Sequence, residues 1–135
     1  GADGWQISNL PILSLAPYLA SVHLFDEVGM EALIAKRDHI TSYLEFILHE
    51  IDKEVVSSFE IITPSNPAER ASQLSVLLHG EGSSLFDYLM KKGVITDWRE
   101  PNVIRLAPVP LYTSYEDMYD FGQILKAGIL NKTCL

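Results

Sequence analysis

One arginine in the last third of the chain could bind an acid. Arg105 lies within the segment 102–112, which alternates apolar and other residues before its prolines. Alternation predicts a strand with Ile104 and Leu106 on one face and Arg105 on the other, and Pro108 cannot continue the sheet ladder. A guanidinium held on a rigid strand can bind a carboxylate through two parallel hydrogen bonds. From the residues alone, a surface arginine in a weak ion pair is the more common situation.

A second group of polar residues lies near the beginning of the chain. Ser8 and Asn9 precede the apolar segment 12–28, and Pro11 stands close to its start. Short polar side chains in this position are typical of helix caps, and proline is common in a first helical turn. The alternative is that both side chains face a ligand, and the residues by themselves favour the cap.

Other constellations are weaker. Glu45 and His49 are four residues apart on a predicted helix, but two ligands do not close a metal site. The glycine-containing loop 80–84 precedes a helix and could hold a phosphate, although Glu81 would repel one and capping by the serines explains the loop better. Cys134 has no local histidine partner. The sequence therefore predicts no metal site and no self-contained catalytic constellation.

Composition narrows the class of protein. A chain of 135 residues with 47% apolar residues can bury the core of one domain. The net charge of −8 and the pI near 4.8 argue against nucleic acid or an anionic membrane as a partner. No apolar run approaches the length of a bilayer span, and a single cysteine excludes an internal disulfide. These features fit a cytoplasmic protein.

Two helices are predicted first. Apolar residues predict a helix over 12–28, kinked or restarted at Pro17 because proline lacks the donor for the preceding turn. Spacings of three and four from Met30 to Ile51 then predict an amphipathic helix of about 20 residues. The opposite face of this second helix is expected to be solvated and carries Glu31, Lys36, Asp38, Glu45 and Glu50.

Short strands and two more helices follow. The strands are predicted over 59–63, 73–79, 94–98 and 103–107. Ser84 with Asp87 and Ser114 with Asp117 read as capping boxes, and Gly93 should end the first of these helices. The order predicts an α+β fold, a small antiparallel sheet of about four strands covered on one face by helices, with N-terminal helices before it. Arg105 should point from the uncovered face, where another domain could pack.

Three separated motifs resemble kynureninase, a pyridoxal-phosphate enzyme of the aminotransferase-like fold. They are the segments 6–12, 61–66 with 69–70 and 73–75, and 104–112. Their order and spacing match the C-terminal part of that family across nearly the whole chain, although Leu10 stands where the family usually has proline. The chain also begins as if cut from something longer. The resemblance implies a C-terminal small-domain fragment over 1–135, with a lead-in over 1–10, helices over 11–52 and a ββαββα unit over 58–131.

The resemblance also implies a reaction. The family hydrolyses kynurenine or 3-hydroxykynurenine to anthranilate or 3-hydroxyanthranilate plus alanine, in tryptophan catabolism and NAD biosynthesis. Pyridoxal 5'-phosphate does the difficult chemistry. By this resemblance Arg105 and Ser8 bind the substrate and Asn9 lies at the cofactor, while no catalytic residue is expected in the fragment itself.

The same resemblance implies that the fragment is incomplete. None of its lysines stands in a context like that of the family's Schiff-base lysine: Lys36, Lys53, Lys91, Lys92, Lys126 and Lys132. The isolated chain is therefore expected to be inactive, to need the missing large domain of the same polypeptide, and to belong to a homodimer. The alternative is a free-standing amino-acid-binding or regulatory α+β module.

Overall fold

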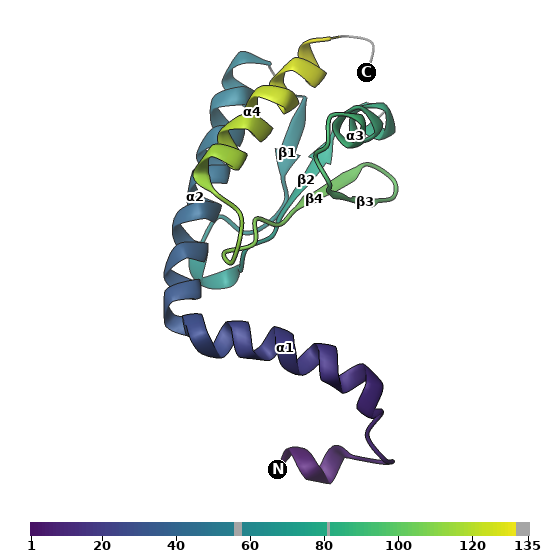
Figure 1. Ribbon diagram of the computed structural model, residues 1–135. Coiled ribbons are helices and arrows are strands. Elements are labelled where there is room, and N and C mark those ends of the chain that lie inside the picture. The colour runs from purple at the N-terminus through teal and green to yellow at the C-terminus, as the bar shows by residue number, and fades with distance from the viewer. Residues whose placement is uncertain (56–57, 81, 132–135) are drawn as a thin grey trace. The chain divides into compact units, whose positions relative to one another are not determined.

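The computed structural model describes residues 1–55, 58–80 and 82–131 (Figure 1). The chain divides into two compact units, Gly1–Leu33 and Ile34–Leu135. The boundary falls inside a helix, where the sequence predicts no domain boundary. In chain order the elements are η1 (Ala2–Trp5), α1 (Ile12–Val28), α2 (Met30–Glu54), β1 (Phe59–Ile61), η2 (Pro67–Glu69), β2 (Leu74–Leu78), α3 (Gly82–Lys91), β3 (Asp97–Arg99), β4 (Val103–Leu106) and α4 (Tyr115–Leu130).

The first unit is dominated by α1, which has the predicted bounds. It runs through Pro17 as one helix, so the proline does not start a new one. Gly29 ends α1 with a φ of 80°, and its N–H donates to the carbonyl of Phe25 at 2.8 Å. No residue of α1 is buried, and the side chains of Ile12 and Leu13 are 79% and 91% exposed. The apolar residues of this helix are distributed around its circumference and are not buried.

The second unit contains a four-stranded sheet in the order β1-β2-β4-β3. Every neighbouring pair is antiparallel. The two short-range pairs, β1 with β2 and β3 with β4, are the hairpin pairs that the sequence predicts. The central pairing of β2 with β4 joins them and brings Ser75 opposite Arg105. The predicted α+β fold with a small antiparallel sheet is confirmed.

The helices of this unit cover one face of the sheet. Alternate strand residues point into a single core together with side chains from α2, α3 and α4. Leu44 of α2, Leu89 of α3 and Leu74 of β2 are at most 1% exposed, and burying each such leucine contributes about 2 kcal/mol. The core comprises Leu44, Leu48, Ile51, Val55, Phe59, Leu74, Val76, Leu78, Leu85, Leu89, Ile104, Leu106, Phe121, Leu125 and Ile129.

Two predicted helix ends are confirmed. The Ser114 side chain accepts from the Asp117 N–H at 3.0 Å, while the Asp117 carboxylate accepts from the Ser114 N–H at 2.7 Å, which completes the capping box of α4. At the end of α3, Gly93 has a φ of 83°, and its N–H donates to the carbonyl of Met90. The Val94 N–H donates to the carbonyl of Leu89, which forms a Schellman motif.

Several predicted boundaries are wrong. α3 begins at Gly82, so Ser84 is its third residue and not its cap. A Cβ at Gly82 would lie 2.7 Å from Cδ1 of Leu78, so the helix start packs closely onto β2 and a larger residue would displace the Leu78 side chain. β3 begins at Asp97 and not at residue 94, because Val94 belongs to the end of α3. The strands are also shorter than predicted, and α2, at 25 residues, is longer. Within the described ranges, no helix is long and apolar enough to span a bilayer.

Candidate functional site

Arg105 lies on β4, a central strand, with Ser75 of β2 on one side and Asp97 of β3 on the other. The flanking residues Ile104 and Leu106 are 2% and 6% exposed and belong to the core. The side chain of Arg105 therefore points to the opposite face, and it is 32% exposed. The predicted direction of this arginine is confirmed.

Arg105 is bound to an acid of the same sheet. Its Nε donates to Oδ2 of Asp97 at 2.5 Å, and its Nη2 pairs with the same oxygen. Nε of Arg99 donates to that oxygen at 3.0 Å. The hydrogen bond from Arg105 holds the pKa of Asp97 below its usual value, so its carboxylate is ionised at neutral pH. The three side chains together carry a charge of +1 in a chain whose formal charge is −8.

The guanidinium of Arg105 keeps donors for a ligand. Of its five N–H donors, Asp97 takes those on the edge formed by Nε and Nη2. In the described part of the chain, Nη1 of Arg105 has no hydrogen-bond partner. The remaining edge, formed by Nη1 and Nη2, is a planar fork that matches a carboxylate. This arrangement can bind the carboxylate of an amino acid while the Asp97 contact remains in place.

Ser8 and Asn9 lie in the first unit, between η1 and α1, and both are exposed. The N-cap residue of α1 is Pro11, and the cap has no side-chain hydrogen bond, so the helix-cap interpretation of Ser8 and Asn9 is wrong. The Ser8 carbonyl accepts from Nε2 of Gln6 at 3.0 Å. The segment 1–33 has neither lysine nor arginine. Pyridoxal phosphate needs a covalent lysine and partners for its phosphate, so this segment does not hold the cofactor by itself.

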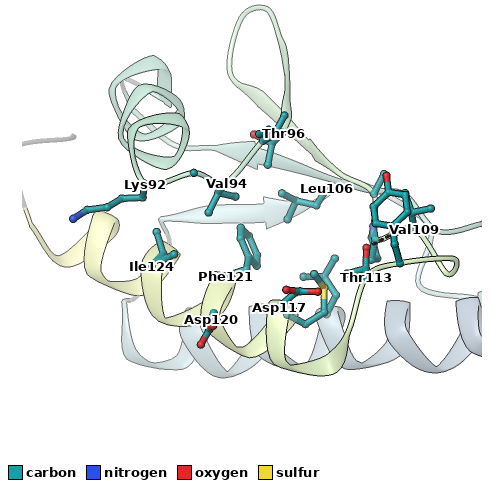
Figure 2. A pocket seen from close by; sticks show the side chains of 17 residues that line it. Lys92, Val94, Thr96, Leu106, Val109, Thr113, Asp117, Asp120, Phe121 and Ile124 are labelled. Carbon is teal, nitrogen blue, oxygen red and sulfur yellow. Dashed lines mark hydrogen bonds between the residues drawn. The ribbon is translucent and has the colours of Figure 1, made fainter.

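A cleft of about 500 Å³ opens in the second unit beside β4 and α4 (Figure 2). Leu106, Phe121 and Ile124 give it an apolar lining. Because Leu106 and Arg105 point to opposite sides of β4, the cleft and the arginine do not share a face. Asp117 also lines the cleft, but its carboxylate is occupied by the cap of α4. The cleft could not be predicted from the sequence, because its walls come from separate segments that carry no common pattern.

Glu45 of α2 does not lie on a solvated face as predicted. Glu45 was expected to be solvated, but its carboxylate binds Nη1 and Nη2 of Arg70 at 2.8 and 2.5 Å. It is therefore not available to pair with His49 at a metal. Among the residues that the structure describes, no group of three or more histidine, cysteine, aspartate or glutamate side chains could hold a metal ion. Three residues named as sequence candidates lie outside the described part of the chain: Glu81, Lys132 and Cys134.

The geometry can be set beside known proteins. Residues 33–125 match the family model of the kynureninase C-terminal domain. The chain is 89% identical over 132 residues to the kynureninase of Flavobacterium johnsoniae and 81% identical over 130 residues to that of Flavobacterium psychrophilum. These matches cover 98% and 96% of this chain and 31% of each relative.

A more distant relative gives the same result. The kynureninase of Xanthomonas euvesicatoria is 47% identical over 130 residues, which cover 94% of this chain and 30% of the relative. The chain thus spans about a third of the length of the curated relatives that it matches. The family model includes Arg105 and Asp97 and the sheet that carries them. On these matches, the chain belongs to the kynureninase C-terminal domain family.

Proposed function

We propose that this chain supplies the substrate-carboxylate site of a hydrolase that cleaves a carbon–carbon bond in kynurenine or 3-hydroxykynurenine. The products are anthranilate or 3-hydroxyanthranilate, and alanine. The relatives are kynureninases, which supports the activity. The chain covers only 31% of their length, which supports a role as one part of a longer polypeptide. The isolated chain is proposed to be inactive.

The observation that carries this proposal is the placement of Arg105. It stands on a central strand, points from the open face of the sheet, and leaves the Nη1–Nη2 edge for a ligand. A carboxylate bound there would be fixed in two dimensions by paired, charge-assisted hydrogen bonds. These paired hydrogen bonds would orient the amino acid so that the scissile bond faces the reacting groups. A positioning contact accelerates a reaction in this way.

The proposed cofactor is pyridoxal 5'-phosphate. When bound, it supplies an electron sink for the chemistry at the amino acid. Asn9 is proposed to contact the cofactor, and Ser8 to contact the substrate. The covalent lysine and the phosphate site are proposed to come from the remainder of the polypeptide, because the segment that contains Asn9 has neither lysine nor arginine.

We further propose that the complete enzyme works as a homodimer in the cytoplasm, in tryptophan catabolism and NAD biosynthesis. The exposed apolar surface of α1 supports association, because contiguous apolar surfaces of this kind mark contact sites. The acidic composition supports the proposal that neither nucleic acid nor a membrane is a partner.

The test is turnover by the full-length parent polypeptide loaded with pyridoxal phosphate, followed through anthranilate fluorescence. Arg105→Ala should lower kcat/KM by about 100-fold or more, as removal of a charged partner of a carboxylate does. The matched control is Arg37→Ala, since Arg37 is similarly exposed and also pairs with an aspartate, Asp38. It should change kcat/KM by less than about twofold.

Two results would count against the proposal. A loss of less than about threefold in the Arg105→Ala enzyme would exclude a carboxylate-binding role. Absence of turnover on both kynurenine and its 3-hydroxy form by the unmutated enzyme would reject the activity. It would favour a related pyridoxal-phosphate reaction or an amino-acid-binding module.

A further inference from the structure

One carboxylate on the open sheet face serves two arginines. Asp97 lies on the edge strand β3, opposite Arg105 in the sheet register. Its Oδ2 accepts from Nε of Arg105 at 2.5 Å and from Nε of Arg99 at 3.0 Å. Arg99 stands two residues after Asp97 and therefore on the same face of β3. Side-chain exposures of 32% for Arg105, 48% for Asp97 and 59% for Arg99 leave the cluster accessible to a ligand.

The Asp97 contact selects one edge of the Arg105 guanidinium. By occupying Nε and Nη2, it restrains the plane of the group and leaves the Nη1–Nη2 edge for a ligand. A free arginine side chain would lose rotamer entropy when it bound a carboxylate. An arginine that is already ordered loses less, and preorganisation of this kind raises affinity without adding a contact.

Asp97 does not neutralise the binding site, because the cluster contains a second arginine. Asp97 and Arg105 alone would be neutral, and the carboxylate of Asp97 would repel a second carboxylate nearby. Arg99 shares the same oxygen and restores a net charge of +1. Glu60, the acid on the outward face of β1, lies at the far edge of the sheet, since the strand order places β2 and β4 between β1 and β3. Glu100, which follows Arg99, accepts from Nε1 of Trp98 rather than from either arginine, so the three side chains of β3 and β4 keep their net charge of +1.

We propose that Asp97 is a positioning residue that holds the Arg105 guanidinium with its Nη1–Nη2 edge toward the α-carboxylate of the amino-acid substrate, while Arg99 keeps the cluster positive. The inference rests on the proposed function of Arg105. It adds a role for a residue that does not itself touch the substrate.

The experiment uses the full-length enzyme with its cofactor and two ligands that differ only at the carboxylate. The first is kynurenine, for which KM and kcat are measured. The second is kynuramine, in which hydrogen replaces the α-carboxylate, and its inhibition constant is measured. Asp97→Ala should raise KM for kynurenine about tenfold, the scale of one charge-assisted hydrogen bond, and change kcat by less than about threefold. The inhibition constant of kynuramine should not move.

A conservative variant and a control separate positioning from folding. Asp97→Asn has nearly the same shape and can still accept a hydrogen bond, so it should raise KM less than Asp97→Ala. It also keeps the test open if the alanine variant fails to fold. Glu60→Gln removes one negative charge from the same face of the sheet away from Arg105 and should leave both ligands unaffected.

The outcomes distinguish this inference from the function on which it rests. If Arg105→Ala abolishes the preference for kynurenine over kynuramine while both Asp97 variants retain it, the positioning role is wrong and the role of Arg105 stands. If Arg105→Ala leaves that preference unchanged, both are wrong. Tighter kynurenine binding in Asp97→Ala, or equal weakening of both ligands, would also overturn the positioning role.

Discussion

Arg70, between η2 and β2, binds Glu45 in the middle of α2 with both of its terminal nitrogens. Nη1 and Nη2 lie 2.8 and 2.5 Å from the two carboxylate oxygens, and only 4% of the Arg70 side chain is exposed. Nη1 also donates to the carbonyl of Pro64 at 3.3 Å. The pair ties the segment between β1 and β2 to a helix 25 residues earlier in the chain.

Replacing Arg70 with methionine should lower the free energy of unfolding by about 3 kcal/mol. The Glu45 carboxylate, 19% exposed, would then lack its charged partner, and removal of one member of a buried pair is strongly destabilising. Urea unfolding followed by circular dichroism measures the change. Arg37→Met, which breaks the more exposed pair with Asp38, should cost less than about 0.5 kcal/mol. Equal losses for the two variants would contradict a special role for the Arg70 pair.

The same pair should make stability depend on acid. The hydrogen bond from Arg70 lowers the pKa of Glu45 below its ordinary value of 4.5. A carboxyl whose pKa is lower in the folded state adds stability above the unfolded-state pKa and loses it as pH falls through the folded-state pKa. The unmutated chain should therefore have a higher free energy of unfolding than Glu45→Gln. This difference should be largest near pH 6 and should decrease below about pH 4.5.

Urea unfolding of both proteins between pH 6 and pH 3 measures this difference. Asp97 and Asp117 also have lowered pKa values, through Arg105 and Ser114, and contribute in the same direction to both proteins. Comparison with Glu45→Gln therefore isolates the contribution of Glu45 to the pH dependence of the free energy of unfolding. A difference that stays constant down to pH 3 would show that the ion pair does not govern this pKa.

The two serines of the expected capping boxes should behave differently. Ser114→Ala removes the acceptor for the Asp117 N–H and should lower the free energy of unfolding by about 1 kcal/mol. Ser84 lies inside α3, so Ser84→Ala should stay within about 0.5 kcal/mol. Thermal unfolding of both variants makes the comparison. A larger loss at Ser84 would restore the cap that the sequence predicts there.

The surface of α1 should cause self-association of the 135-residue chain. A helix that is apolar around its circumference is normally enclosed, and α1 has no buried residue. Leu13→Lys combined with Leu24→Lys, at side chains that are 91% and 53% exposed, should shift the chain toward the monomer in sedimentation velocity. Ile95→Lys is the control, because Ile95 is 86% exposed but lies in the second unit. An equal shift for the control would exclude α1 as the cause.

Local features of this protein were determined by the sequence by itself. Alternation around Arg105 predicts its outward direction, the Ser114 and Asp117 spacing predicts the capping box of α4, and Gly93 predicts the end of α3. Each depends on residues within a few positions of one another, whose geometry follows from the periods of helix and strand. The three motifs also indicated the family, which the comparisons confirm.

Relationships between distant segments were decided only by the tertiary structure. The pairing of β2 with β4, the ion pair of Arg70 with Glu45, and the start of α3 at Gly82 depend on how segments pack. The sequence predicts that Asp97 lies in a strand, but its place opposite Arg105 follows from the sheet register. Register and helix packing are set by burial of many side chains at once. No single stretch of sequence contains that information, and for this reason the cluster around Arg105 became visible only in the folded chain.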